Sequence, residues 1–369
     1  MERALARSRD RLTAPRPNRR RIRLMIVDDS MIARAVLSRM IEADGAFEIA
    51  AVAGTAEDAV EALKQVRVDI VILDLEMPGA GGLKSIPRII RAAAGAKVMI
   101  VSSLAEEGAE GTVAALALGA ADTLPKPGTG RFNGRFSEIL LSRLKALGYA
   151  SVAERDPAIA RPGVPAPLRA MPTDPIDVLA IGASTGGIHA LGVLFDNLPQ
   201  RIGVPILVTQ HLPALFMPVF ARQLGTAARR EMVVAEDGMA LLPDRILLAP
   251  GDAHLTLDSS GDVPVVQLSH ERTTSGCMPS LDPMFASVSA AFGRGALGIV
   301  LTGMGRDGVE GAERLVAGGG SILAQDELSC AVWGMPRAVL EAGLASATLP
   351  PEKIARRIAA RTEEQRPCR

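Results

Sequence analysis

The feature that most constrains the fold of this chain is a regular alternation of short apolar runs with helical stretches, which begins after residue 23. Apolar runs of strand length occupy residues 24–27, 47–52, 70–73, 98–101 and about 121–124. Helical patterns follow them at 32–41 and near 56–66, 83–93, 109–118 and 137–148. Strands that alternate with helices predict βαβ units and a parallel sheet covered by helices on both faces. Ligands of such sheets bind outside the carboxyl ends of the strands, so we expect chemistry there.

The same alternation starts again in the second half of the chain. Strands are expected at 177–181, 204–209, 245–249 and 297–301, and helices near 187–196, 281–292, 308–317 and 351–362. Residues 253–268 alternate in a way that indicates a β-hairpin. We therefore predict a second α/β unit, doubly wound and mainly parallel, with an antiparallel insertion.

A proline-rich stretch separates the two halves. Six prolines fall within residues 155–175, which hold few apolar residues able to form a core. This composition is typical of a semi-rigid linker between domains. The expected organisation is a disordered basic tail at 1–21, a first domain at 22–148, a linker at 149–174 and a second domain at 175–369.

The overall composition limits the location and the partners of the protein. Its 369 residues are 48% hydrophobic and 22% charged, with a formal net charge of +0, so the chain as a whole is no obvious binder of nucleic acid. Three widely spaced cysteines suit a reducing cytosol, and no apolar stretch approaches the roughly 20 residues that span a bilayer. We expect a soluble, cytoplasmic protein without membrane insertion. Nine arginines within residues 1–23 could contact anionic lipid or nucleic acid, although such a run is more often a solvated extension.

Strand ends in the first half carry groups suited to phosphate chemistry. Asp28 and Asp29 follow the first strand, Asp74 the third, Ser102 the fourth and Lys126 the fifth. Three carboxylates in one crevice repel each other unless a hard cation such as Mg²⁺ neutralises them. A single acid after a strand is more often a helix cap or a turn residue. The full set, at matching ends of the strands, instead predicts a site for Mg²⁺ and a phosphoryl group.

The stretches that contain the three acids and the lysine, "IVDDS", "VILDLEMPG" and "LPKP", resemble the receiver domain of two-component response regulators. The resemblance implies a flavodoxin-like (βα)5 fold in which Asp74 is the phosphoacceptor. It also implies that Asp28 and Asp29, with Asp74, hold Mg²⁺. Ser102 and Lys126 would sense the phosphoryl group, which a histidine kinase would supply.

The second half opens with "IGASTGG", where a strand turns into a helix. A dinucleotide-binding loop would require an acid at the end of the next strand, which instead ends in Gln210 and His211, and the Gly-Lys-Ser/Thr of a P-loop is also missing. The stretch does fit G-x-S-x-G, in which small neighbours expose a serine, here Ser184, on a sharp turn before a helix. Serines and glycines also crowd ordinary turns, so the motif by itself leaves a plain turn open.

Serine chemistry requires a base and a carboxylate, and the chain offers both at strand ends. His211 ends the strand that follows the helix of Ser184, and Asp307 follows the strand at 297–301 in "GIVLTGMGRDG". These three residues form the expected catalytic triad, with Asp307 orienting the imidazole. The order Ser…His…Asp differs from that of α/β-hydrolases, so His254 or His270 as the base remains a rival arrangement.

The second half resembles the chemotaxis protein-glutamate methylesterase family through "IGASTGG", "QHLP", "PSLDPMFASV", "LTGMGRDG" and "AQDELSCAVWGMP". A receiver in front of such a domain is what this family requires. The resemblance implies a phosphorylation-activated serine hydrolase with Ser184, His211 and Asp307 as its triad. It would demethylate glutamate methyl esters and deamidate glutamines on chemoreceptors, and the receiver would inhibit it until phosphorylated.

The other class of function considered is a regulator whose second domain binds a partner or nucleic acid. That function would favour a helix-turn-helix or a basic surface, and residues 175–369 contain no sequence signal for either. We therefore expect an enzyme. We expect it to need Mg²⁺ in the receiver and no cofactor in the second domain. The sequence does not identify the receptor or the kinase.

Overall fold

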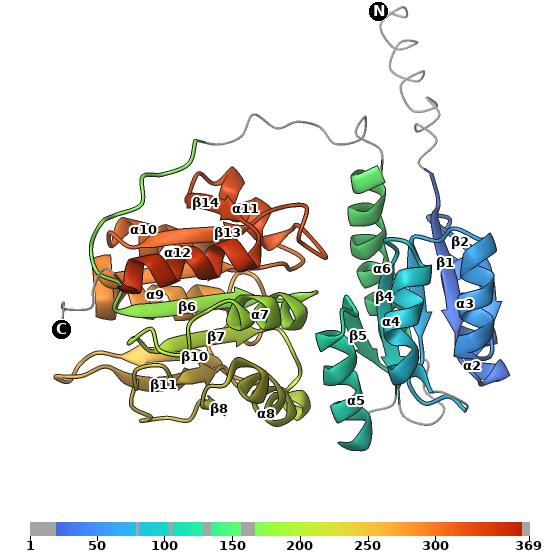
Figure 1. Cartoon of the computed structure of the whole chain (residues 1–369), viewed down its shortest axis with the longest axis horizontal. Helices are drawn as coiled ribbons and strands as arrows, with labels where there is room; N and C mark the ends of the chain where they lie inside the picture. The colour runs from blue at the N-terminus through green and yellow to red at the C-terminus, as the bar shows by residue number, and fades with distance from the viewer. Residues whose placement is uncertain (1–19, 79–80, 103–105, 128–133, 156–166, 364–369) are drawn as a thin grey trace, which may run out of the picture.

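The computed structural model of the chain describes residues 20–78, 81–102, 106–127, 134–155 and 167–363. Most of the basic tail and residues 156–166 of the expected linker lie outside this range. The described residues form two α/β units, each built on its own parallel sheet, and a separate hairpin (Figure 1).

The first unit is a five-stranded parallel sheet with helices on both faces. Its strands, in the order β2-β1-β3-β4-β5, are β1 (Ile22–Val27), β2 (Phe47–Ala53), β3 (Ile70–Leu73), β4 (Lys97–Ser102) and β5 (Asp122–Pro125). Its helices are α2 (Met31–Glu42), α3 (Ala56–Gln65), α4 (Gly82–Ala92), α5 (Glu106–Ala117) and α6 (Gly134–Arg155). This strand order is that of flavodoxin-like folds, so the expected (βα)5 fold is confirmed.

The apolar runs of this sheet are continuous because both faces are buried. Along β1, Leu24 and Ile26 join a core with α2 and α6, whereas Met25 and Val27 join a core with α3, α4 and α5. Hydroxyl residues cap the starts of two helices: the Ser30 hydroxyl accepts from the N–H of Ala33 at α2, and the Thr55 hydroxyl accepts from the N–H of Asp58 at α3. The last helix, α6, runs through Arg155 and is longer than the helix predicted near 137–148.

The second unit is a seven-stranded, fully parallel sheet in the order β14-β13-β12-β6-β7-β9-β8. Its strands are β6 (Val178–Ala183), β7 (Ile206–Gln210), β8 (Met232–Val234), β9 (Ile246–Leu248), β12 (Ala296–Val300), β13 (Ser321–Gln325) and β14 (Ala345–Leu349). One face carries α7 (Gly187–Asp196), α8 (Met217–Ala228) and α12 (Pro351–Glu363), and the other carries α9 (Leu281–Phe292), α10 (Val309–Ala317) and α11 (Met335–Glu341). The predicted hairpin is present as β10 (His254–Asp258) and β11 (Val265–Ser269).

The doubly wound, mainly parallel architecture predicted for this unit is confirmed, but several of its elements were not predicted. These are the strands β8, β13 and β14 and the helices α8 and α11. Strand β8 has only three residues, which is too short for a period of two to stand out. The chain leaves β6 for β7 on one side and returns to β12 on the other, so β6 lies at the switch point where such folds bind ligands.

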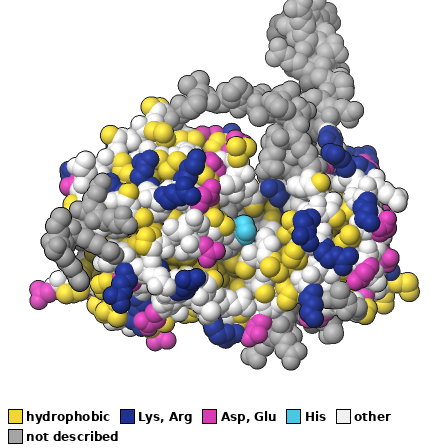
Figure 2. All heavy atoms as spheres, viewed as in Figure 1, with side chains coloured by type: hydrophobic (Ala, Val, Ile, Leu, Met, Phe, Trp, Pro, Cys, Tyr) yellow, Lys and Arg dark blue, Asp and Glu magenta, His cyan; other side chains and the backbone are white. Residues whose placement is uncertain are grey.

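The two units contact each other through helices. Helix α5 packs against α7 and α8, and one hydrophobic cluster includes Val113 and Leu116 of α5 together with Ile188 and Phe220 (Figure 1). On the face drawn in Figure 2, basic and acidic side chains are interspersed with hydrophobic ones. None of the described helices is long and apolar enough to cross a lipid bilayer.

Candidate active site

The predicted acidic residues meet at the carboxyl edge of the first sheet. Carboxylate oxygens of Asp28, Asp29 and Asp74 all lie within 4.8 Å of one another. Asp28 and Asp74 are buried, whereas Asp29 is exposed. The Lys126 ammonium bridges the two buried acids, at 2.8 Å from Asp28 Oδ2 and 2.7 Å from Asp74 Oδ2. The structure thus brings together the residues that the sequence placed at separate strand ends.

The environment of these groups favours a second cationic partner. Burial raises the pKa of Asp74, and the nearby Asp28 charge raises it further, against the lowering effect of Lys126. Burial lowers the pKa of Lys126, but its bonds to Asp28 and Asp74 outweigh that effect and the net shift is upward. Three oxygen donors with one lysine suit Mg²⁺. The hydroxyl of Ser102 is buried and has no hydrogen-bond partner among the described residues, so it is free to bind a phosphoryl oxygen.

In the second sheet, adjacent strands bring Ser184 and His211 together. Ala183 lies opposite Gln210 in the β6–β7 register, so the residues that follow them are neighbours. The His211 N–H donates to the Ala183 carbonyl at 3.0 Å, and Gln210 Nε2 donates to the Ser184 carbonyl at 2.9 Å. The Ser184 hydroxyl makes no hydrogen bond to His211 within the described residues. Bonds of this kind often tighten only when substrate is bound.

Two glycines make the turn around Ser184 possible. Gly186, which begins α7, has φ of 77°, a conformation that side chains with a Cβ rarely adopt. At Gly303, a Cβ would lie 2.7 Å from the Cβ of Ser184, so only glycine lets the loop after β12 approach the serine. The two glycines therefore allow a tight, half-buried turn at Ser184, against which the loop after β12 packs closely.

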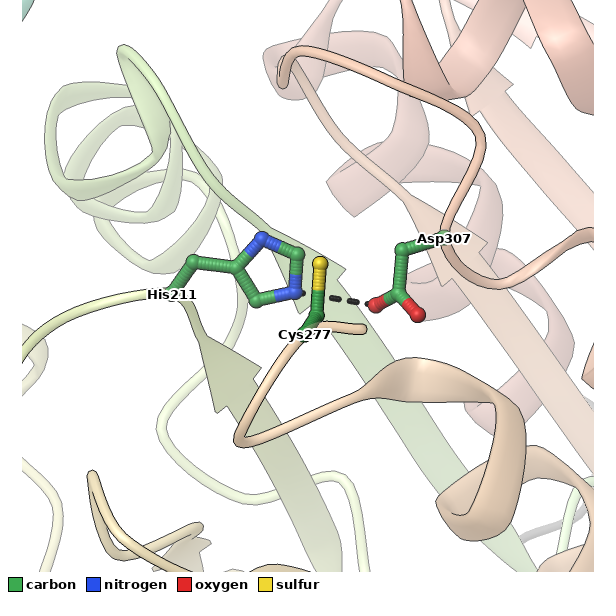
Figure 3. Close-up of side chains that lie close together, drawn as sticks. All are labelled: His211, Cys277 and Asp307. Carbon is green, nitrogen blue, oxygen red and sulfur yellow. Dashed lines mark hydrogen bonds and ion pairs between the residues drawn. The ribbon is translucent and has the colours of Figure 1, made fainter. Parts of the chain in front are cut away.

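Asp307 pairs with His211 and is held by three further donors. His211 Nε2 lies 2.9 Å from Asp307 Oδ2, which also accepts the N–H of Leu281 at 2.8 Å (Figure 3). The hydroxyls of Ser275 and Ser280 donate to Oδ1, at 2.7 and 2.5 Å. Burial alone raises the pKa of Asp307, but the bonds from His211, Ser280 and Leu281 outweigh it and lower the pKa to about 2. The carboxylate is therefore ionised and fixed in orientation.

The two rival histidines have other partners. His254 is fully buried, with Nε2 2.8 Å from the Glu271 carbonyl, and Nδ1 accepts the N–H of Ser280 at 2.9 Å. His270 is exposed and lies 3.1 Å from the Asp252 carbonyl. The imidazole that meets Asp307 is that of His211.

Several residues of the site were not singled out from the sequence. Ser280 begins α9 as its N-cap while its hydroxyl also donates to Asp307. Ser275 and Cys277 come from the segment between β11 and α9, which has no periodic pattern that would place it. The only signal for this group was "PSLDPMF", which reads as an ordinary helix cap.

The first unit contacts the loop that carries Ser184. The Gly186 N–H donates to the carbonyl of Ala121 at 2.6 Å, and the Thr185 hydroxyl lies 3.4 Å from Asp122 Oδ2. Asp122 also pairs with Arg143 at 3.0 Å, and burial raises its pKa against that pairing. The N-terminal end of β5 therefore reaches the loop of the candidate nucleophile.

Both halves of the chain match known protein families. A family model described as CheB methylesterase matches residues 179–358, and one described as response regulator receiver domain matches residues 24–131. Protein-glutamate methylesterase/protein-glutamine glutaminase 1 of Paramagnetospirillum magneticum is 36% identical, over 93% of this chain and 97% of that protein. Protein-glutamate methylesterase/protein-glutamine glutaminase 2 of Caulobacter vibrioides is 38% identical, over 92% of this chain and 99% of that protein. By sequence and by architecture, this chain belongs to the family of receiver-containing protein-glutamate methylesterases/protein-glutamine glutaminases.

Proposed function

We propose that the protein is a phosphorylation-activated serine hydrolase that removes methyl esters from glutamates, and amide groups from glutamines, of bacterial chemoreceptors. The observation that carries the proposal is the position of three groups on neighbouring strand ends: Ser184 after β6, His211 after β7 and Asp307 after β12. The names of its relatives supply the substrate class. The reaction would take place in the cytoplasm and would give sensory adaptation.

We infer a role for each nitrogen of His211. Because Nε2 is bonded to Asp307, it carries the proton, and Nδ1 is the nitrogen left to accept the proton of Ser184. The Ser184 oxygen attacks the ester carbonyl carbon as Nδ1 takes its proton. When the C–O bond of the ester breaks, the imidazolium gives this proton to the departing oxygen, which leaves as methanol; with a glutamine, the C–N bond breaks and ammonia leaves. Water then cleaves the acyl-enzyme by the same steps. The ionised Asp307 stabilises the imidazolium that forms each time.

The first unit would act as the receiver. We propose that an Asp74 oxygen attacks the phosphorus of a phosphohistidine on a chemotaxis kinase and becomes an aspartyl phosphate. Asp28 and Asp29, with Asp74, would hold Mg²⁺, which offsets the negative charge of the incoming phosphoryl group. Lys126 and Ser102 would then bind the phosphoryl oxygens, since Lys126 already bridges the acids and Ser102 has a free hydroxyl.

We further propose that the docked receiver inhibits the hydrolase. The Ala121 carbonyl occupies the N–H of Gly186, two residues from the nucleophile, where free N–H groups at a helix start could stabilise an oxyanion. Around it, Glu110 of α5 pairs with Arg222 of α8 at 2.5 Å, and His189 lies 3.2 Å from the Ala117 carbonyl. These polar contacts surround the apolar contact of α5 with α7, as is usual for a reversible interface between domains.

Strand β5 offers a route from the phosphorylation site to this interface. Lys126 follows its carboxyl end, while Ala121 and Asp122 stand at its amino end against the Ser184 loop. A shift of Lys126 toward a phosphoryl group would therefore pull on the contacts with Gly186 and favour undocking. The boundaries proposed for the moving parts are 22–148 and 175–369, joined by the linker 149–174, although residues 149–155 continue helix α6 of the first unit.

Methanol release from methylated chemoreceptor tests the function. Ser184→Ala should abolish release while the circular dichroism spectrum is retained, and His211→Ala should do nearly as much because members of a triad act as a unit. A His270→Ala variant is the matched control, since His270 contacts the Asp252 carbonyl and should keep its activity. An active His211→Ala together with an inactive His270→Ala would refute the assignment in favour of the rival order.

A further inference from the structure

A cysteine stands beside the pair formed by His211 and Asp307. Figure 3 shows the sulfur of Cys277 next to the imidazole, on the side where Nε2 faces the carboxylate. A ring nitrogen of His211, Cys277 Sγ and a carboxylate oxygen of Asp307 all lie within 4.8 Å of one another. The proposed hydrolysis uses the histidine and the aspartate but gives the thiol no task.

Imidazole, thiolate and carboxylate are the three ligand types that zinc prefers in proteins. Bonds of about 2.0 to 2.3 Å in tetrahedral geometry separate neighbouring ligand atoms by about 3.5 Å. The three ligand atoms lie within 4.8 Å of one another, and His211 Nε2 lies 2.9 Å from Asp307 Oδ2, so side-chain rotations could bring them to three corners of a zinc site. The fourth corner would remain open to water.

We propose that His211, Cys277 and Asp307 bind Zn²⁺, and that zinc bound there switches the hydrolase off. The inhibition by zinc rests on the proposed function, whereas the binding of zinc does not. Zinc would replace the proton on Nε2, so the neutral imidazole would carry its proton on Nδ1 instead. A protonated Nδ1 cannot accept the proton of Ser184, and the serine loses its base.

The surroundings of the three ligands support a metal site. The Ser275 and Ser280 hydroxyls fix the Asp307 carboxylate through Oδ1, which leaves Oδ2 on the side of the imidazole. The segment of Cys277 is tied as well, because its N–H donates to Ser275 Oγ at 3.3 Å. Cys277 is only partly buried and lines a cavity of about 430 Å³ with Asp307, which gives an ion a way in.

Binding must release a proton from the thiol. Burial and the Asp307 charge both raise the pKa of Cys277, so the group is a thiol in the absence of metal. One proton leaves the sulfur when zinc binds, while the proton of the imidazole only changes nitrogen. The two negative ligands then balance the charge of the ion, and the affinity for zinc should rise with pH.

The test uses the full-length protein and ZnCl₂ in a metal-buffered solution. Zinc should inhibit methanol release by wild type, and Cys277→Ala should need at least roughly 100-fold more zinc for the same fractional inhibition, relative to its own activity without zinc. Cys330→Ala is the matched control, because Cys330 is a buried cysteine outside the cluster, and its zinc sensitivity should equal that of wild type. Equal zinc sensitivity of Cys277→Ala and wild type, or no inhibition of wild type, would refute the inhibitory role.

A second readout does not depend on hydrolysis. Co²⁺ bound in place of zinc should give a thiolate-to-cobalt charge-transfer absorption in wild type and in the inactive Ser184→Ala variant, and none in Cys277→Ala. The absorption in Ser184→Ala separates failure of the metal site from failure of the proposed function. If wild type shows no such band, or Cys277→Ala keeps it, the metal site is wrong.

Discussion

Replacement of Asp307 by asparagine removes a charge from the proposed triad while it keeps the size of the side chain. In the wild type, Oδ2 accepts from His211 and Leu281, and Oδ1 accepts from Ser275 and Ser280. Hydroxyl groups can rotate to accept a hydrogen bond, whereas the Leu281 N–H cannot. The asparagine should therefore place its oxygen toward Leu281 and His211 and its amide nitrogen toward the two serines, with the imidazole tautomer unchanged.

In that orientation, the loss of activity measures the loss of charge alone. A carboxylate and an imidazolium with charge centres about 4 Å apart interact by about 4 kcal/mol at an effective dielectric constant of about 20. At about 1.4 kcal/mol per factor of ten, kcat should fall by about three orders of magnitude. The opposite orientation would force the wrong tautomer of His211 and should cost about four orders.

Methanol release by Asp307→Asn, measured after phosphodonor treatment, gives the comparison. Asp282→Asn is the matched control, because this neighbouring carboxylate accepts from the Gly311 N–H and should keep activity within about tenfold. A kcat of Asp307→Asn above about a tenth of the wild-type value, or an equal loss in the control, would contradict a catalytic role for the Asp307 charge.

Three further predictions concern the phosphorylation site, the contact between the two units and the buried carboxyl group of Asp282. A small phosphodonor with Mg²⁺ should stimulate hydrolysis by wild type but not by Asp74→Asn, and equal stimulation would contradict the receiver assignment. The fragment 174–369, if its circular dichroism shows it folded, should hydrolyse faster than the unphosphorylated full chain and should not respond to the phosphodonor; a folded fragment that is no faster than the full chain would contradict inhibition by docking. Burial raises the pKa of Asp282 to about 6, so its contribution to the free energy of unfolding is present below about pH 4 and is lost as the pH rises through 6. Urea denaturation at about pH 4.5 and about pH 7.5 should therefore show a smaller fall for Asp282→Asn than for wild type.

The sequence by itself determined the two α/β units and the strand ends that carry the chemistry. Continuous apolar runs mark strands buried on both faces, and the polar residue after each run must then lie at the carboxyl edge. Asp74 and Lys126 could be placed together on this ground, as could Ser184 and His211, because consecutive parallel strands are usually neighbours. Strand β8 was not predicted from the sequence, because its three residues are too few to establish a period of two.

Tertiary structure alone decided which groups complete the candidate site and which residues of the first unit contact the loop of Ser184. The hydroxyl of Ser280 and the thiol of Cys277 reach Asp307 from a segment without periodicity, across 27 residues in the case of Ser280. The contact of Ala121 with Gly186 joins two separate sheets. Local propensity holds no information on such contacts, because they depend on how α9 and α5 pack against elements far away in the chain.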